Sequence, residues 1–251
     1  MYGTMRTMNE NELTTKPQPQ RQENMLLNIV LNIVIPTVIL IKFSGEEHLG
    51  ARNGIIVALA FPILYGLREF WLTRKLNFFS ALGVLSILLT GGISLLELDP
   101  KYIAIKEAAI PGLFGIATLL SLKTRYPLVK TFLYNDKILR VDLINEALSQ
   151  NDTLDLFEKA LFNASLMIAG SFFLSSVLNF TLAKVLLVSA PGTEAFNAEL
   201  GAMTAWSFPV ITIPTMLILV VALFYLLRSI KRHTGLALDD VFQEAPKKNQ
   251  G

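Results

Sequence analysis

The clearest candidates for chemistry in this sequence are the adjacent Lys106 and Glu107, which lie inside an apolar segment. An ionised side chain in a hydrocarbon layer is costly unless it has a partner or water, so such residues commonly mark a binding or proton-relay site. Pro111 strengthens this interpretation, because a proline blocks the helical hydrogen bond to the carbonyl four residues earlier, which here belongs to Glu107. A carboxylate, a freed carbonyl and a cation are therefore expected close together.

The same pair also has a purely structural interpretation. Helix rise puts Lys106 about 5 Å inside the predicted membrane boundary, so its ammonium can reach the outer interface or meet Glu97 and Asp99. Because neighbouring helical residues point about 100° apart, Lys106 and Glu107 are not expected to face one another. Two interpretations therefore stay open: a polar site inside a helix bundle, and a charged pair at its outer edge.

Asparagines form a second group of polar residues in apolar segments. Asn28 and Asn32 are four residues apart in the first segment, while Asn163 and Asn179 lie in the fifth. Such side chains either join helices through hydrogen bonds, worth roughly 0.6–2 kcal/mol each, or line a substrate path. The candidate binding residues are therefore Lys106, Glu107, Asn32, Asn163 and Asn179.

Several classes of function are disfavoured by what the sequence lacks. It has no cysteine, which removes disulfides, thiolate metal sites and cysteine nucleophiles. It has two distant histidines and no phosphate-binding loop or nucleophile motif. Its net charge of +2 gives no basic field for nucleic acid. We therefore expect no enzyme activity, no cofactor, no metal and no nucleic-acid partner.

The elements that carry these residues follow from composition and length. Of 251 residues, 52% are hydrophobic and 17% are charged, and the mean hydropathy is +0.49. Roughly 20 apolar helical residues cross a hydrocarbon layer about 30 Å thick. Six segments meet that length, at about 25–42, 53–72, 77–97, 103–122, 161–187 and 202–227. The sequence thus predicts an all-α, polytopic membrane helix bundle with six transmembrane helices.

Charge distribution predicts the orientation of this bundle. Of the 22 lysines and arginines, five lie on the side of the odd-to-even turns and seventeen on the side of both tails. Positive charge gathers in the cytoplasm, so both termini are expected there. The domain plan is a disordered tail at 1–24, a membrane domain at 25–230 and a second cytoplasmic tail at 231–251.

The cytoplasmic loop at 123–160 is too patterned for a simple connector. Apolar residues recur at helical spacing through 131–160, and Asp152 is placed to cap a second short helix. Amphipathic helices of this kind lie on the membrane surface or pack against the cytoplasmic end of the bundle. Both interpretations are kept.

Five prolines fall within the predicted spans, and each removes one backbone hydrogen bond. They are Pro36, Pro62, Pro111, Pro209 and Pro214. The last two should bend the sixth helix. Such bends either help to form a cavity or are ordinary features of membrane bundles.

The order of several short strings carries a family resemblance. They are Gly91-Gly92-Ile-Ser-Leu-Leu, Tyr102-Ile103, Lys106, Leu113-Phe114, Leu119-Leu120, Pro127-Leu128-Val129-Lys130, Leu161-Phe162-Asn163-Ala164, Leu178-Asn179 and Ala183. In order and spacing the chain resembles the intracellular septation protein A family of bacterial inner-membrane proteins over about residues 25–230. It differs in a longer polar N-terminal tail, a longer 131–160 loop and an additional proline-rich last span.

The resemblance implies an inner-membrane protein of envelope maintenance and division, and it implies no particular chemistry. Its partners would be the lipid bilayer and other envelope proteins or a second copy of the chain. The alternative is a small-solute or proton-coupled transporter built on Glu107 and the bent helices. A transporter predicts a water-accessible cavity near the membrane midplane, whereas a scaffold predicts a well-packed interior.

Overall fold

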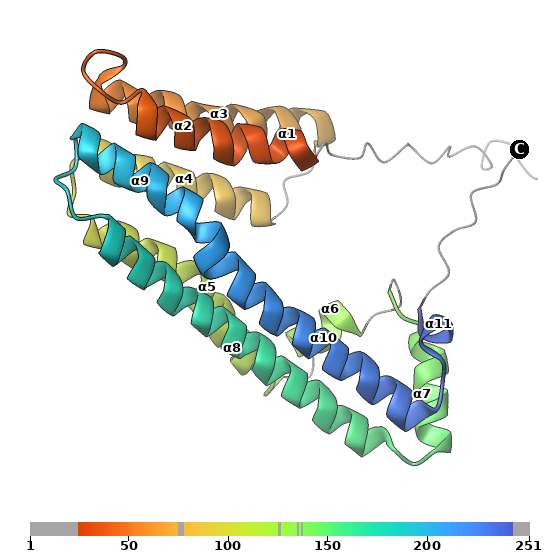
Figure 1. The fold of residues 1–251 in the computed structure, drawn as a ribbon. Helices are drawn as coiled ribbons and strands as arrows, with labels where there is room; N and C mark the ends of the chain where they lie inside the picture. The colour runs from red at the N-terminus through yellow and green to blue at the C-terminus, as the bar shows by residue number, and fades with distance from the viewer. Residues whose placement is uncertain (1–24, 75–77, 125–126, 135, 137, 243–251) are drawn as a thin grey trace, which may run out of the picture.

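The computed structural model describes residues 25–74, 78–124, 127–134, 136 and 138–242 (Figure 1). Throughout this part of the chain the regular elements are helices. One isolated antiparallel backbone bridge pairs Leu139 with Phe242. The predicted all-α class is therefore confirmed. The predicted disordered tail at 1–24 lies outside the described residues, as does 243–251.

Four helical stretches are long and apolar enough to cross a membrane. They are α3 (Gly50–Thr73), α5 (Lys101–Ser121), α8 (Leu154–Leu186) and the continuous stretch formed by α9 (Glu194–Ser207), η3 (Phe208–Thr212) and α10 (Ile213–Thr234). The chain thus has the features of a multi-pass membrane protein.

The first and third predicted spans form shorter apolar helices, Leu26–Lys42 and Ala81–Leu95. The first consists of α1 (Met25–Ile29), η2 (Val30–Val34) and α2 (Ile35–Lys42), and the second lies within α4 (Phe78–Leu95). All six predicted segments are helical, but only four reach membrane-spanning length on their own. Six spans therefore remain a prediction.

Two helices are longer than the sequence pattern indicates. α8 has 33 residues and begins at Leu154, before the predicted start at 161. The last stretch has 41 residues and begins at Glu194, within what looked like a turn at 188–201. At about 1.5 Å per residue they measure roughly 50 and 60 Å, well beyond a 30 Å hydrocarbon layer. Part of each must project beyond the membrane.

Two of the five prolines are accommodated by a widened helical turn. The π-helical segments η2 and η3 end two residues before Pro36 and Pro214 respectively. The amide that follows each segment bonds five residues back, from Ile35 to Val30 and from Ile213 to Phe208. A widened turn moves the backbone away from the proline ring, which would otherwise crowd the preceding carbonyl. Pro62 and Pro111 stay within regular α-helix.

The three turns at 43–49, 96–100 and 187–193 gather at one end of the molecule, which we call the turn end (Figure 1). The side chain of Glu97 lies against Gly192, and that of Glu194 lies against Gly45. A hydrophobic core beneath these turns joins α2, α3, α5, α8 and α9. Its buried members are Leu40, Ile55, Ala58, Ile103, Ala104, Ala183, Leu187, Phe196, Leu200 and Met203.

The opposite end, which we call the α7 end, carries three short helices: α6 (Leu128–Leu133), α7 (Val141–Gln150) and α11 (Leu238–Val241) (Figure 1). They cover the projecting parts of α8 and α10 with a second core. Its buried members are Tyr134, Leu139, Ile144, Leu148, Phe157, Leu161, Ala164, Leu226, Ile230 and Val241.

This second core decides between the two interpretations of the 131–160 loop. Ile144 and Leu148 are fully buried against the bundle rather than turned outward to a membrane surface. The packing therefore supports docking on the bundle end. Asp152 does not cap a short helix, because it adopts a positive φ of 53° and the next residue, Thr153, occupies the N-cap position of the long α8.

Residues 235–242, which follow α10, also pack against this core. Gly235 adopts the left-handed conformation that ends the helix, with a φ of 73°. The backbone amide of Arg140 then donates to the carbonyl of Val241 at 2.9 Å. The described part of the predicted C-terminal tail, 231–242, thus completes α10 and packs on α7.

Candidate functional site

The Lys106–Glu107 pair lies on the face of α5 that meets α4. The Lys106 ammonium is 2.6 Å from the Glu107 carboxylate and forms an ion pair with it. It also donates to the hydroxyls of Thr90 at 2.6 Å and Ser86 at 3.0 Å, both on α4. Lys106 is 9% exposed, so this polar cluster is buried between two helices.

The cluster uses the full donor capacity of the lysine. An ammonium has three N–H groups, and the two α4 hydroxyls and the carboxylate supply three acceptors. Thr90 in turn donates its hydroxyl to the carbonyl of Ser86 at 3.0 Å. Lys106 is therefore held in one position, while the Glu107 side chain stays 25% exposed.

This arrangement corrects two expectations from the sequence. Lys106 and Glu107 do face each other, because the four-carbon lysine stem lets the ammonium swing across the 100° between neighbouring side chains. Lys106 also does not extend to the outer edge toward Glu97 and Asp99. Asp99 instead pairs with Lys101 at 3.1 Å, and hydrogen bonds from the Lys101 amide and side chain lower the pKa of that carboxyl.

A hydrogen bond from α8 reaches α5 at the residue that directly follows the pair. The Ser176 hydroxyl donates to the carbonyl of Ala108 at 2.7 Å, next to the carbonyl that Pro111 frees. Gly112 and Gly115 allow this approach, because a Cβ at either position would come within 3.2 Å of a side chain of α8. α5 is thus joined by polar contacts to α4 and to α8.

The three candidate asparagines do not converge on this site. Asn32 donates to Asn28 at 2.9 Å within its own helix, and Asn179 donates to the carbonyl of Ser175 at 2.8 Å, also within its own helix. Asn163 donates to the hydroxyl of Tyr225 at 3.1 Å and so joins α8 to α10. The structure brings together Lys106 and Glu107 only.

Sequence analysis missed Ser86 and Thr90, the α4 partners of Lys106. Their spacing of four residues put both hydroxyls on one face of an apolar helix, and that spacing was the available indication. It also missed Asn197 of α9, which is fully buried and donates to the carbonyl of Ala51 at 2.7 Å. Asn197 lies in 188–201, the segment predicted to be a turn.

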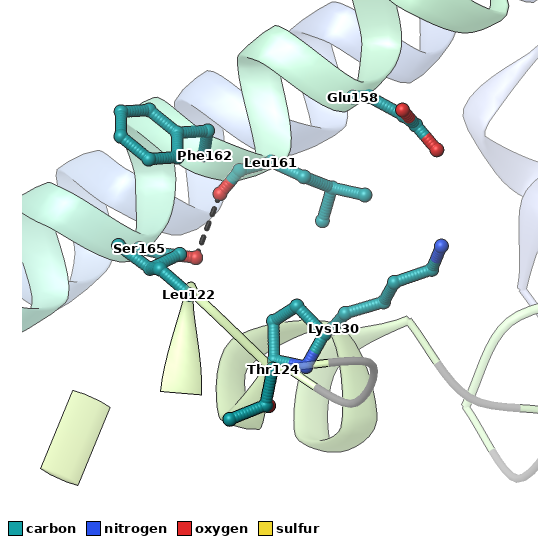
Figure 2. A pocket seen from close by; sticks show the side chains of 8 residues that line it. Leu122, Thr124, Lys130, Glu158, Leu161, Phe162 and Ser165 are labelled. Carbon is teal, nitrogen blue, oxygen red and sulfur yellow. Dashed lines mark hydrogen bonds between the residues drawn. The ribbon is translucent and has the colours of Figure 1, made fainter. Parts of the chain in front are cut away.

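A cleft of about 290 Å³ lies away from this cluster, between the α5–α6 connection and α8 (Figure 2). Its lining residues are Leu122, Thr124, Pro127, Lys130, Glu158, Leu161, Phe162 and Ser165. Glu158 projects from α8 and Lys130 from α6, so the two charged side chains come from the two walls of the cleft with Leu161 between them (Figure 2). The sequence contained a cation and an anion just outside two apolar segments, but their convergence depends on the fold.

The chemistry available at these sites is hydrogen bonding and charge pairing. Among the described residues, no three histidine, aspartate or glutamate side chains gather as potential metal ligands. A buried ammonium with three acceptors is suited to joining helices or to binding a polar group at Glu107. The comparisons add no assignment, since no family model, curated protein or solved structure matches this chain.

Proposed function

We propose that this chain is a multi-pass protein of the bacterial inner membrane that acts as an interaction or scaffold protein in envelope maintenance and division. Six helices cross the membrane, and both termini and the α7 end lie in the cytoplasm. The protein carries out no catalysis of its own. The resemblance to the intracellular septation protein A family supports the cellular role, and the charge distribution supports the orientation.

One structural observation supports a scaffold above the other roles. The candidate polar residues found in the sequence bond within the protein, in separate places rather than around one common site, although the buried side-chain oxygens of Thr37, Ser94 and Asn197 have no partner among the described residues. Lys106 bonds to α4 and Glu107, and Asn163 bonds to Tyr225. Polar residues used in this way fix helix positions, which is what a platform for partners requires.

Cysteine accessibility tests the orientation. The chain has no native cysteine that would add background labelling. We expect a cysteine replacing the exposed Ala190 at the turn end to react with an impermeant maleimide in intact cells. A cysteine replacing the exposed Ser149 on α7 should react only after the cells are opened. The reverse pattern contradicts the proposed orientation.

A transporter is the second candidate, because the buried ion pair supports it specifically. Charged residues inside a membrane span often serve transport or proton relay, and the partly exposed Glu107 carboxylate is the group that would do so. The neutral double variant Lys106→Met/Glu107→Gln separates the two roles, because it removes both charges together and leaves neither ion unpaired.

The test is complementation of a deletion strain, with protein abundance measured in parallel. A scaffold predicts that the double variant restores the phenotype at normal abundance. Loss of complementation at normal abundance would reject the scaffold and favour transport. The matched control is Lys101→Met, which removes the lysine of the exposed pair with Asp99 and should complement in either case.

A further inference from the structure

The cleft of Figure 2 lies beside the end of α5 and is lined by one lysine, one glutamate and several apolar side chains. We propose that it binds the headgroup of a zwitterionic phospholipid with a primary amine, of the phosphatidylethanolamine class. Lys130 would receive the phosphate and Glu158 the ammonium group. This inference requires only that the chain lies in a membrane, so it is independent of the proposed scaffold role.

The depth of the cleft is the first argument. α5 begins at Lys101 beneath the turn end and finishes at Ser121, and its 21 residues span about 31 Å. That length matches the hydrocarbon thickness of about 30 Å. Leu122 and Thr124 directly follow α5, and Lys130 comes from the next helix, α6, so the cleft lies at the end of α5, where a helix of this length reaches the headgroups.

The second argument is the pair of charges. Lys130 comes from α6 and Glu158 from α8, and both are exposed. Neither takes part in an ion pair within the described part of the chain, although both line the same cleft. A cation and an anion held on opposite walls are complementary to a molecule that carries both charges a few ångströms apart.

The third argument is the apolar part of the lining. Leu122 and Leu161 provide apolar walls, while Phe162 is 49% exposed and continues this surface outward on α8. The hydroxyl of Ser165 already donates to the carbonyl of Leu161 at 2.8 Å, so this hydroxyl is satisfied within the protein. A lipid can therefore place its glycerol and first acyl carbons against these side chains.

The charges also select among lipids. An anionic phosphatidylglycerol headgroup would satisfy Lys130 but would leave Glu158 without a partner. The trimethylammonium group of phosphatidylcholine has no N–H to donate to the Glu158 carboxylate, whereas ethanolamine has three. A zwitterionic headgroup with a primary amine therefore gives a partner to both Lys130 and Glu158.

The test uses the purified full-length protein in nanodiscs of phosphatidylcholine that contain a trace of photoactivatable phosphatidylethanolamine. We expect crosslinks to map to the cleft, at 122–124, 127–130 and 158–165. Added phosphatidylethanolamine should compete about fivefold better than added phosphatidylcholine, the scale of one exposed ion pair. Equal competition by the two lipids, or stronger competition by phosphatidylglycerol, would overturn the proposal.

Three variants make the test specific to the two charges. Glu158→Gln should abolish the preference for phosphatidylethanolamine over phosphatidylcholine in the competition, while Lys130→Gln should weaken the crosslinking of the photoactivatable lipid. Lys159→Gln is the matched control, because this exposed neighbour on α8 does not line the cleft and should behave as wild type. Unchanged selectivity in Glu158→Gln, with an unchanged thermal midpoint, would contradict the proposal directly.

Discussion

The hydrophobic cores at the turn end and at the α7 end differ in how many small side chains they bury. The turn-end core includes the small residues Ala58, Ala104 and Ala183, and α9 approaches α2 closely at Gly201. Both cores also contain large side chains, such as Phe196 at the turn end and Phe157 at the α7 end, but the α7-end core has a single alanine, Ala164. The difference follows from the surroundings that each end would meet.

Lipid provides no hydrophobic driving force between helices, so close approach of small residues and interhelical hydrogen bonds must supply the attraction. Water does provide that force, and large apolar side chains gain most from burial there. α7 fits this second case, since Ile144 and Leu148 are buried on one face while Glu146 and Gln150 are exposed on the other. α7 thus has one apolar and one polar face, the pattern of a helix that packs against a protein from water.

The largest expected effect is at the polar contact between α4 and α5. Lys106→Met removes the only partner the structure gives the Glu107 carboxylate among the described residues, and breaking a buried ion pair costs about 3–5 kcal/mol. The double variant Lys106→Met/Glu107→Gln should recover most of this loss. The thermal midpoint in detergent measures both, and a double variant no more stable than Lys106→Met would contradict a paired role.

The next effect is at the α7 end, where hydrophobic burial dominates. Ile144→Ala truncates a fully buried side chain and should cost about 2–5 kcal/mol. Because the loss falls on α7 and its contacts, hydrogen exchange should rise in 138–150 and remain unchanged at the turn end. Ile138→Ala is the control, since Ile138 is 46% exposed and should change little. Equal exchange in both variants would argue against a docked α7.

A smaller effect is expected at Gly201, where α9 approaches α2 closely. A Cβ at Gly201 would come within 2.8 Å of Ile41 and 3.2 Å of the Thr37 carbonyl. Gly201→Ala should therefore cost about 1–3 kcal/mol through overpacking. Gly83, where a Cβ would meet nothing within 4 Å, provides the matched control as Gly83→Ala. A lower thermal midpoint for Gly201→Ala alone is the expected result.

The comparison also explains what the sequence could predict. Continuous apolar runs identified all six helical segments, because periodicity and length are local properties. A helix after Asp152 was also predicted, but its continuity with the span was missed, because the charged residues in 154–160 suggested a separate short helix whereas α8 runs unbroken from Leu154 to Leu186. Lys106 and Glu107 were found from their charge alone. Ser86, Thr90 and the Lys130–Glu158 cleft depend on which helices become neighbours, and no local pattern contains that information.

The smallest expected effect is the loss of the hydrogen bond between Asn163 and Tyr225, which we expect to stabilise the protein less than the Lys106–Glu107 ion pair. Asn163 donates to the hydroxyl of Tyr225 at 3.1 Å, and both side chains are exposed at the α8–α10 contact. Tyr225→Phe removes the acceptor and keeps the ring, so it should cost only about 0.6 kcal/mol, the average for such bonds in membrane proteins. If this bond instead fixes the α8–α10 contact, the variant will lose stability on the scale of Lys106→Met. The expected result is a thermal midpoint within a degree or two of wild type. It would show that the α8–α10 hydrogen bond contributes less to stability than the polar contact between α4 and α5.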